Sequence, residues 1–196
     1  MKASRQLHEI TPAPRTIFRA RRRGLGLLEL CACMCCVALL TLRALPELTT
    51  LRDRQAARNV ADALDQQLRL ARLLALSHGE NMRLTVRPLT GASGHCSLVH
   101  TGAAVLCTCA TAPDTVRCEA PARLLYSSKT RLDEAGATVI GVERSLLFSA
   151  KYGTVTPAAT FEVRSRKGQR VRKIINVLGR VRGCSPTGLP DMPACD

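Results

Sequence analysis

Eight basic side chains gather in one short stretch near the C-terminal end of this 196-residue chain. Residues 164–182 contain no acid, and their basic residues are Arg164, Arg166, Lys167, Arg170, Arg172, Lys173, Arg180 and Arg182. Such a stretch attracts phosphate groups, and a bound nucleic acid releases its condensed counterions. Arginine forks match the geometry of phosphate oxygens and of groove edges. We therefore predict that this stretch binds double-stranded DNA.

The basic charge of the chain is local rather than general. The formal net charge is +14, and the first 24 residues contribute +6, because they carry seven lysines and arginines against Glu9. The remaining +8 equals the charge of residues 164–182 alone, so the rest of the chain is electrically balanced. A charge concentrated in this way is typical of a binding surface.

The basic stretch also fits roles that do not involve DNA. Charges on an edge strand prevent sheets from pairing, and they could bind an acidic protein or an envelope lipid. The stretch contains no predicted recognition helix, which argues against reading of base sequence. The aromatic residues are scattered, which argues against stacking on single strands. We therefore expect backbone binding to duplexes of any sequence, with an affinity that falls steeply as salt rises.

The ten cysteines form two groups. Cys31, Cys33, Cys35 and Cys36 lie in an apolar run, where we expect them to behave as small buried hydrophobic residues. The other six are Cys96, Cys107, Cys109, Cys118, Cys184 and Cys195. An even number of thiols in an oxidising compartment predicts up to three disulfides, whose pairing the sequence leaves open.

Neither a metal centre nor a catalytic site is predicted. His95, Cys96, His100, Cys107 and Cys109 are close in sequence, but their spacing matches no tetrahedral zinc pattern. No cysteine, serine and histidine combination supports nucleophilic catalysis. We therefore expect no catalytic residue, no cofactor and no enzymatic activity. A pair of acids at residues 133–134, just before a glycine, is expected to form a turn.

The elements that must position the basic stretch begin with a long helix. The run from Leu25 to Leu42 is about 18 residues long, which is enough to span a hydrocarbon core, and only Glu29 interrupts it. Beyond Pro46, apolar residues recur at helical spacing and predict an amphipathic continuation to about Ser77. The apolar stripe consists of Val60, Leu64, Leu68, Ala71 and Ala75. The charged opposite face consists of Arg52, Asp53, Arg54, Arg58, Asp62, Asp65, Arg69 and Arg72.

A series of short strands comes after the helix. Gly79 is expected to cap the helix in a left-handed conformation. Alternating or apolar runs bounded by glycine and proline predict strands at residues 82–87, 97–99, 105–110, 123–126, 138–142, 146–149, 160–163 and 171–177. The segment 91–121 holds four cysteines and fits a disulfide-tied loop equally well. One helix followed by strands predicts an α+β fold, in which the helix packs on a small antiparallel sheet.

The beginning of the chain resembles a type IV prepilin leader. Three arginines and Gly24 precede Leu25, Glu29 is the fifth residue after Gly24, and Pro46 is the twenty-second. In that family a membrane peptidase cuts after the glycine, and the glutamate pairs with the terminal amine of a neighbouring subunit. The resemblance implies cleavage between Gly24 and Leu25 and a role in assembly for Glu29. An ordinary signal anchor is the alternative.

Three later stretches resemble FimT and GspH pseudopilins, in the same order along the chain. Leu68–Glu80 with Met82–Val86 is similar to their passage from helix to first strand. Leu147–Val155 resembles their "F…G" turn, and Ile174–Arg182 resembles their closing strand with its GRxR end. In the FimT branch this motif is associated with DNA binding, which points to Arg180 and Arg182.

The resemblance implies a type IV pilin-like chain with three parts. These are a leader at 1–24, a transmembrane and pilus-core helix at 25–45, and a globular domain at 46–196 with its helix at 46–78 and its β-rich part at 79–196. We expect a minor pilin that binds double-stranded DNA for uptake in natural transformation. Its partners would be the prepilin peptidase, the inner membrane and other pilin subunits, and its final location the periplasm or the cell surface. The alternative is a GspH-like pseudopilin with a structural role in type II secretion.

Overall fold

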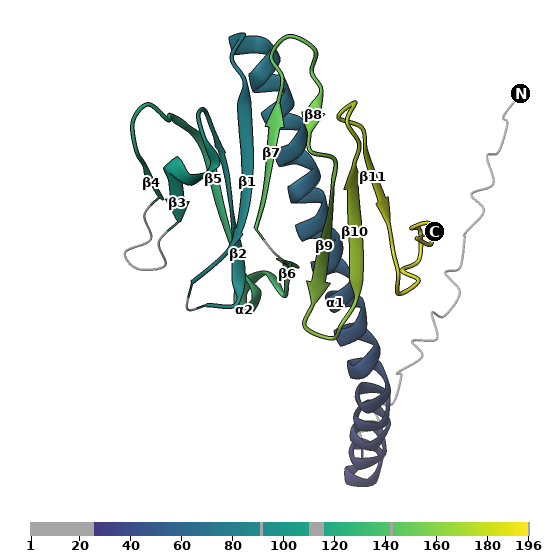
Figure 1. The fold of residues 1–196 in the computed structure, drawn as a ribbon. Coiled ribbons are helices and arrows are strands. Elements are labelled where there is room, and N and C mark those ends of the chain that lie inside the picture. Colours follow the sequence, from purple (N-terminus) through teal and green to yellow (C-terminus); the bar gives the residue numbers. More distant parts are fainter. Residues whose placement is uncertain (1–25, 91, 110–115, 142, 196) are drawn as a thin grey trace, which may run out of the picture. The chain divides into compact units, whose positions relative to one another are not determined.

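The computed structural model describes residues 26–90, 92–109, 116–141 and 143–195, and its chain divides into two compact units, residues 1–42 and 43–196 (Figure 1). The predicted cleavage positions, Gly24 and Leu25, lie outside the described residues. Helix α1, Leu27–His78, begins in the first unit and continues into the second.

The described part of the first unit is the apolar start of α1. Its side chains from Leu27 to Leu42 are all exposed, and Glu29 lies in the first turn of the helix. Cys31, Cys33, Cys35 and Cys36 are free and exposed. By length and composition α1 is a candidate single membrane span, as its long apolar run predicts.

The second half of α1 belongs to the core of the second unit. All five members of the predicted apolar stripe, Val60, Leu64, Leu68, Ala71 and Ala75, are buried. The helix ends at His78, and Gly79 comes next with a φ of 67°, so the predicted left-handed cap is confirmed. One residue assigned to the charged face differs, because Asp53 is buried rather than solvated.

The strands of the second unit form three antiparallel sheets (Figure 1). A five-stranded sheet has the order β5-β2-β1-β7-β8, and its strands are β1 (Met82–Pro88), β2 (Gly94–His100), β5 (Leu124–Arg131), β7 (Arg144–Phe148) and β8 (Val155–Thr156). A four-stranded sheet has the order β11-β10-β9-β6, and its strands are β6 (Ala137–Ile140), β9 (Ala159–Ser165), β10 (Arg170–Ile175) and β11 (Val181–Cys184). The pair β3 (Cys107–Cys109) and β4 (Val116–Cys118) forms the third.

Helix α1 packs on both larger sheets. Leu64, Leu68, Ala71 and Ala75 contact apolar side chains of β1, β2, β7, β8, β9 and β10. One turn earlier, Ala57, Val60 and Ala61 contact β6, β9 and β10. The sequence therefore predicts the fold class correctly: one long N-terminal helix lies on antiparallel sheet structure.

The remaining differences from the predicted elements are local. Residues 104–106 form a short 3-10 helix, η1 (Ala104–Leu106), where a strand was expected, and β3 begins only at Cys107. Residues 132–135 form a one-turn helix, α2 (Leu132–Ala135), rather than a simple turn. The expected strand 171–177 ends at Ile175, and the chain then turns back into β11, which was not predicted. Strands β4 and β8 were also missed, since two or three residues carry no period.

All six predicted cysteines form disulfides. Cys96 is bonded to Cys109, Cys107 to Cys118, and Cys184 to Cys195. The Cys96–Cys109 bond holds β3 against β2, and the Cys107–Cys118 bond joins β3 to β4. At this place Cys96, Leu98 and Cys107 belong to a small core of their own. Strand β2 is therefore buried on both faces. The zinc alternative fails for these cysteines, because disulfide sulfurs are not available as thiolate ligands.

Candidate nucleic-acid interface

The predicted basic stretch covers three neighbouring strands of the four-stranded sheet. It begins at the end of β9, passes through the hairpin turn to β10, runs along β10, and returns along β11. The hairpin around Gly168 lies at one end of these strands, and the turn between β10 and β11 lies at the other (Figure 1). Because β10 has six residues, the two turns are separated by about 20 Å.

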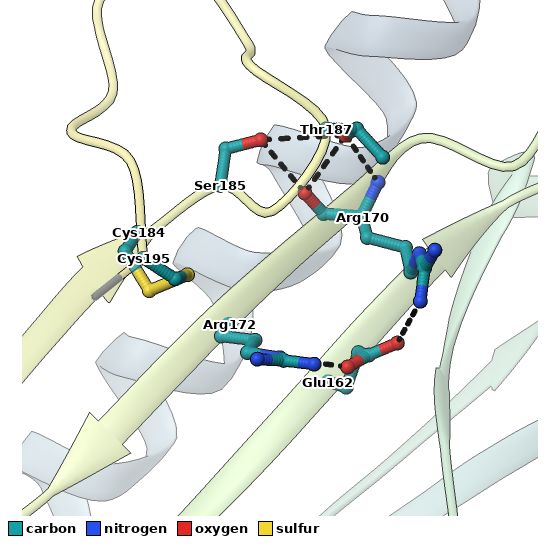
Figure 2. A network of polar contacts seen from close by, with 7 residues as sticks. All are labelled: Glu162, Arg170, Arg172, Cys184, Ser185, Thr187 and Cys195. Carbon is teal, nitrogen blue, oxygen red and sulfur yellow. Dashed lines mark hydrogen bonds and ion pairs between the residues drawn. A yellow bond between two sulfur atoms is a disulfide. The ribbon is translucent and has the colours of Figure 1, made fainter.

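Three of the eight cations have acidic partners. Glu162 on β9 bridges Arg170 and Arg172 on β10, with nitrogen-to-oxygen distances of 3.6 and 2.8 Å (Figure 2). Lys173 is buried on the opposite face of β10, and its Nζ lies 3.0 Å from an oxygen of Asp62 on α1. The buried ammonium of Lys173 holds the sheet to the helix, so we do not assign it to a DNA surface.

The segment after β11 is fixed to β10 by side-chain hydrogen bonds. The Ser185 hydroxyl donates to the carbonyl oxygen of Arg170 at 3.0 Å, and the backbone N–H of Arg170 donates to the Thr187 hydroxyl at 3.1 Å (Figure 2). The Cys184–Cys195 disulfide closes the same segment. These contacts hold the C-terminal segment, and β11 with it, against β10.

Two further cations, both at the Gly168 hairpin, form hydrogen bonds with other segments of the second unit. The guanidinium of Arg166 donates to the backbone oxygens of Leu132 and Asp133. The ammonium of Lys167 donates to the Thr49 hydroxyl at 2.6 Å. Both side chains remain exposed, so their charges still face solvent. Some of their N–H donors, however, already bind other parts of the protein.

The last three predicted residues are free. Among the residues that the structure describes, the side chains of Arg164, Arg180 and Arg182 have no hydrogen-bond or ion-pair partner, and all three are exposed. Arg164 lies near the Gly168 hairpin, while Arg180 and Arg182 lie at the other end. The sequence placed Arg180 and Arg182 at the end of a strand. That placement is wrong, since Arg182 is in β11 and Arg180 directly precedes it.

The turn that carries Arg180 is closely held. The side-chain oxygen of Asn176 accepts hydrogen bonds from the backbone N–H groups of Leu178 and Arg180, at 3.1 and 2.9 Å. The backbone N–H of Gly179 donates to the carbonyl of Asn176, and that of Val155 on β8 donates to the carbonyl of Val177. An Asn that accepts from the residues after it stabilises a tight turn in this way. The backbone at Arg180 is thus fixed before any ligand binds.

Two arginines of α1 lie next to Arg180 and Arg182. A groove of about 540 Å³ is lined by Arg180 and Arg182 on one side and by Arg69 and Arg72 of the helix on the other. Its remaining lining residues are Leu73, Leu76, Gly179 and Val181. Arg69, Arg72, Leu73 and Leu76 succeed one another at helical spacing, so they occupy one face of α1. We call this site the arginine groove.

Sequence reasoning missed the helix side of the groove. Arg69 and Arg72 were assigned to a solvated helix face, and nothing in their spacing relates them to residues more than a hundred positions later. In the structure the stretches Leu68–Glu80, Leu147–Val155 and Ile174–Arg182 meet here, since Arg72 lies between Gly153 and Gly179.

The fold is that of an α+β chain whose long N-terminal helix is apolar at its start and packs on antiparallel sheets through its second half, which is consistent with a pilin-like protein. No protein-family model, no curated protein and no solved structure matches the chain.

Proposed function

We propose that this chain is a FimT-like minor type IV pilin, which binds double-stranded DNA without sequence preference for uptake in natural transformation. In this proposal, α1 anchors the chain in the inner membrane before assembly, Glu29 serves subunit assembly, and the second unit is held outside the membrane in the pilus. Arg180 and Arg182 make the main DNA contacts.

The observation that carries this proposal is the state of Arg180 and Arg182. Both guanidinium groups are exposed and unpartnered in the described part of the chain, and both line one groove. An arginine that already bridges an acid, as Arg172 does, must give up that partner before it can bind a phosphate. Arg180 and Arg182 have no ion pair to break and lie on a fixed backbone, so their contacts with phosphate are favoured.

The other predicted residues divide by the same criterion. Arg164 is free and would add a second contact about one strand length away from the groove. Arg166, Lys167, Arg170 and Arg172 contribute positive potential at the surface, since they are bonded but exposed or half-buried. Lys173 contributes to stability instead, through Asp62.

Binding of labelled duplexes to the full-length chain in detergent micelles tests the proposal. We expect Arg180→Ala/Arg182→Ala to lower the affinity by about tenfold or more for duplexes of unrelated sequence, because two phosphate contacts are lost. The wild-type affinity should fall steeply between roughly 50 and 200 mM salt. Arg117→Ala is the control, since Arg117 is an exposed strand arginine on β4, on the far side of the second unit from β11 (Figure 1).

Two results would overturn the proposal. The first is an absence of binding by the wild-type chain at low salt, which would favour a structural role in a secretion pseudopilus, with the charges facing other subunits. The second is an affinity that stays constant over a roughly tenfold range of salt, because phosphate contacts cannot be insensitive to counterions.

A further inference from the structure

We propose that Arg72 of α1 is a third phosphate-binding residue, and that the arginine groove holds the sugar-phosphate backbone of one DNA strand. This inference rests on the proposed function, and it assigns the part of the DNA that the groove contacts. It adds a residue of the helix to a site that the sequence locates only near the C-terminal end of the chain.

The first support is the way in which Arg72 is held. A Cβ atom added to Gly179 would lie 3.3 Å from Nη1 of Arg72, and one added to Gly153 would lie 3.3 Å from its Nε. Both glycines have positive φ, 74° and 60°, so the two turns can approach the guanidinium closely only as glycines. The Arg72 side chain is therefore fixed between the β7–β8 turn and the β10–β11 turn.

The second support is that the guanidinium of Arg72 has no hydrogen-bond or ion-pair partner among the described residues. Its Nε is buried and has no hydrogen-bond partner, and no acid pairs with its guanidinium among the described residues. A buried donor without a partner costs free energy, and this cost is retained only where something else compensates for it. Arg69, one turn away, differs because Asp65 already accepts from it at 3.0 Å. Because Nε itself is closed to solvent, a phosphate oxygen would bind the guanidinium of Arg72 where it lines the groove.

The third support is the composition of the groove. Arg72 on one side and Arg180 with Arg182 on the other provide three unpartnered cations, while Leu73, Leu76 and Val181 provide apolar surface between them. Leu73 and Leu76 are 63% and 49% exposed, so this surface is open in the free chain. A nucleic-acid strand offers both anionic phosphates and largely apolar deoxyribose faces, and the lining has cations for the first and apolar side chains for the second.

The charge of the groove decides between a nucleic-acid strand and an acidic peptide. Its lining residues include four arginines and no acid. Fixed guanidinium forks discriminate by planar, two-oxygen contacts, which a phosphodiester offers at every step of the strand. An acidic peptide offers such contacts only where its side chains happen to align. Binding of an acidic peptide is therefore an outcome of the test rather than a second proposal.

The salt dependence of DNA binding by Arg72→Gln in the full-length chain tests the inference. Removing one phosphate contact should lower the affinity by about tenfold at low salt and reduce the slope of log affinity against log salt by about 0.9. A change that only loosened the two turns would weaken binding without changing the slope in this way. The unfolding temperature of each variant is measured alongside.

The matched control is Arg54→Gln, because it removes the same charge from the same helix. Arg54 is half-buried, has no partner in the described chain, and lies outside the groove. It is 18 residues from Arg72, or about 27 Å along the helix. We expect its salt slope to equal that of the wild type. An equal reduction in both variants would mean that general charge, and not the groove, binds DNA, and would overturn the inference.

A second measurement does not depend on how well the variant folds. Wild-type chain is treated with an arginine-specific reagent such as phenylglyoxal, with and without duplex, and modified positions are read by mass spectrometry. We expect DNA to protect Arg72, Arg180 and Arg182 together, and to leave Arg54 and Arg117 reactive. Protection of Arg180 and Arg182 without Arg72 would overturn the inference and leave the proposed function standing. Displacement of the DNA from the groove by an acidic peptide at equal charge concentration would also overturn it.

Discussion

At the scale of single residues, two buried histidines stand out, and one of them joins the two larger sheets. His95 on β2 is 3% exposed, and its Nδ1 lies 3.1 Å from the backbone nitrogen of Val139 and 2.9 Å from the hydroxyl of Thr138, both on β6. Since the Val139 N–H donates, Nδ1 must be unprotonated. Burial lowers the pKa of His95 from 6.5 to about 4.

We predict a loss of stability at mildly acidic pH. Between pH 6.5 and about 4 the unfolded chain takes up a proton at this residue while the folded chain does not, so the free energy of unfolding falls as the pH falls. The contribution of His95 is complete above pH 6.5, and its loss amounts to on the order of 3 kcal/mol at pH 4. Chemical denaturation across this range measures it.

The control for this prediction is His95→Asn. The asparagine side-chain oxygen can accept from the Val139 N–H, but it cannot take up a proton in this range. The variant should show a smaller dependence on pH than the wild type. Some dependence should remain, because burial also lowers the pKa of His100. A variant that lost stability with falling pH as steeply as the wild type would show that His95 is not responsible.

At the scale of elements, Asp53 holds the β9–β10 hairpin to α1. It is 8% exposed, and its carboxylate accepts from the Ser165 hydroxyl at 2.5 Å and from the Lys167 backbone N–H at 3.1 Å. Ser165 closes β9 and in turn accepts from the Gln169 N–H. A charge predicted to face solvent thus fixes the hairpin that carries half of the basic stretch.

Replacing this carboxylate should cost measurable stability. We expect Asp53→Ala to lower the free energy of unfolding by about 2 to 3 kcal/mol, because two donors lose a charged acceptor in a largely buried place. Asp65→Ala is the comparison on the same helix, since among the described residues Asp65 pairs only with the exposed Arg69. It should cost below about 0.5 kcal/mol. Similar losses in urea titrations of the two variants would contradict the anchoring role.

At the scale of the whole molecule, every core belongs to the second unit. The buried residues of the described chain lie between Asp53 and Leu189, and all three disulfides join residues in this range or just after it. The described residues before Arg43 are all exposed, and all except Glu29 and Thr41 are apolar or small. The buried apolar contacts and the disulfides that stabilise the fold therefore do not involve the apolar segment that makes α1 a candidate membrane span.

This separation predicts the behaviour of a shortened chain. A chain that starts at Arg43, oxidised before purification, should stay monomeric without detergent, and its unfolding temperature should lie within a few degrees of that of the full chain. The physical reason is that no buried apolar contact is lost while a large exposed apolar surface is removed. Calorimetry and light scattering measure both properties. Aggregation of the shortened chain would show that residues before Arg43 cover apolar surface of the second unit.

Local sequence patterns were enough to predict the long helix, its buried stripe, its glycine cap, the α+β class and the six cysteines that form disulfides. The helix, its stripe and its cap depend on the spacing and type of residues that are close in sequence. The disulfides were expected from the even number of cysteines in an oxidising compartment. The sequence also located the basic stretch. It could not say which cations are free, because the ion pairs form between different elements: Glu162 reaches Arg170 and Arg172 from the neighbouring strand, and Asp62 reaches Lys173 from the helix.

Which of these charges lie together in one groove depends on how the chain packs. The turn after Ile175 folds β11 back on β10, and this brings Arg180 and Arg182 to the helix face that carries Arg72. The contact requires two glycines from different turns to reach one guanidinium, which is a matter of chain packing and leaves no periodic trace in the sequence. The pairing of the disulfides was settled for the same reason, since it depends on which strands become neighbours.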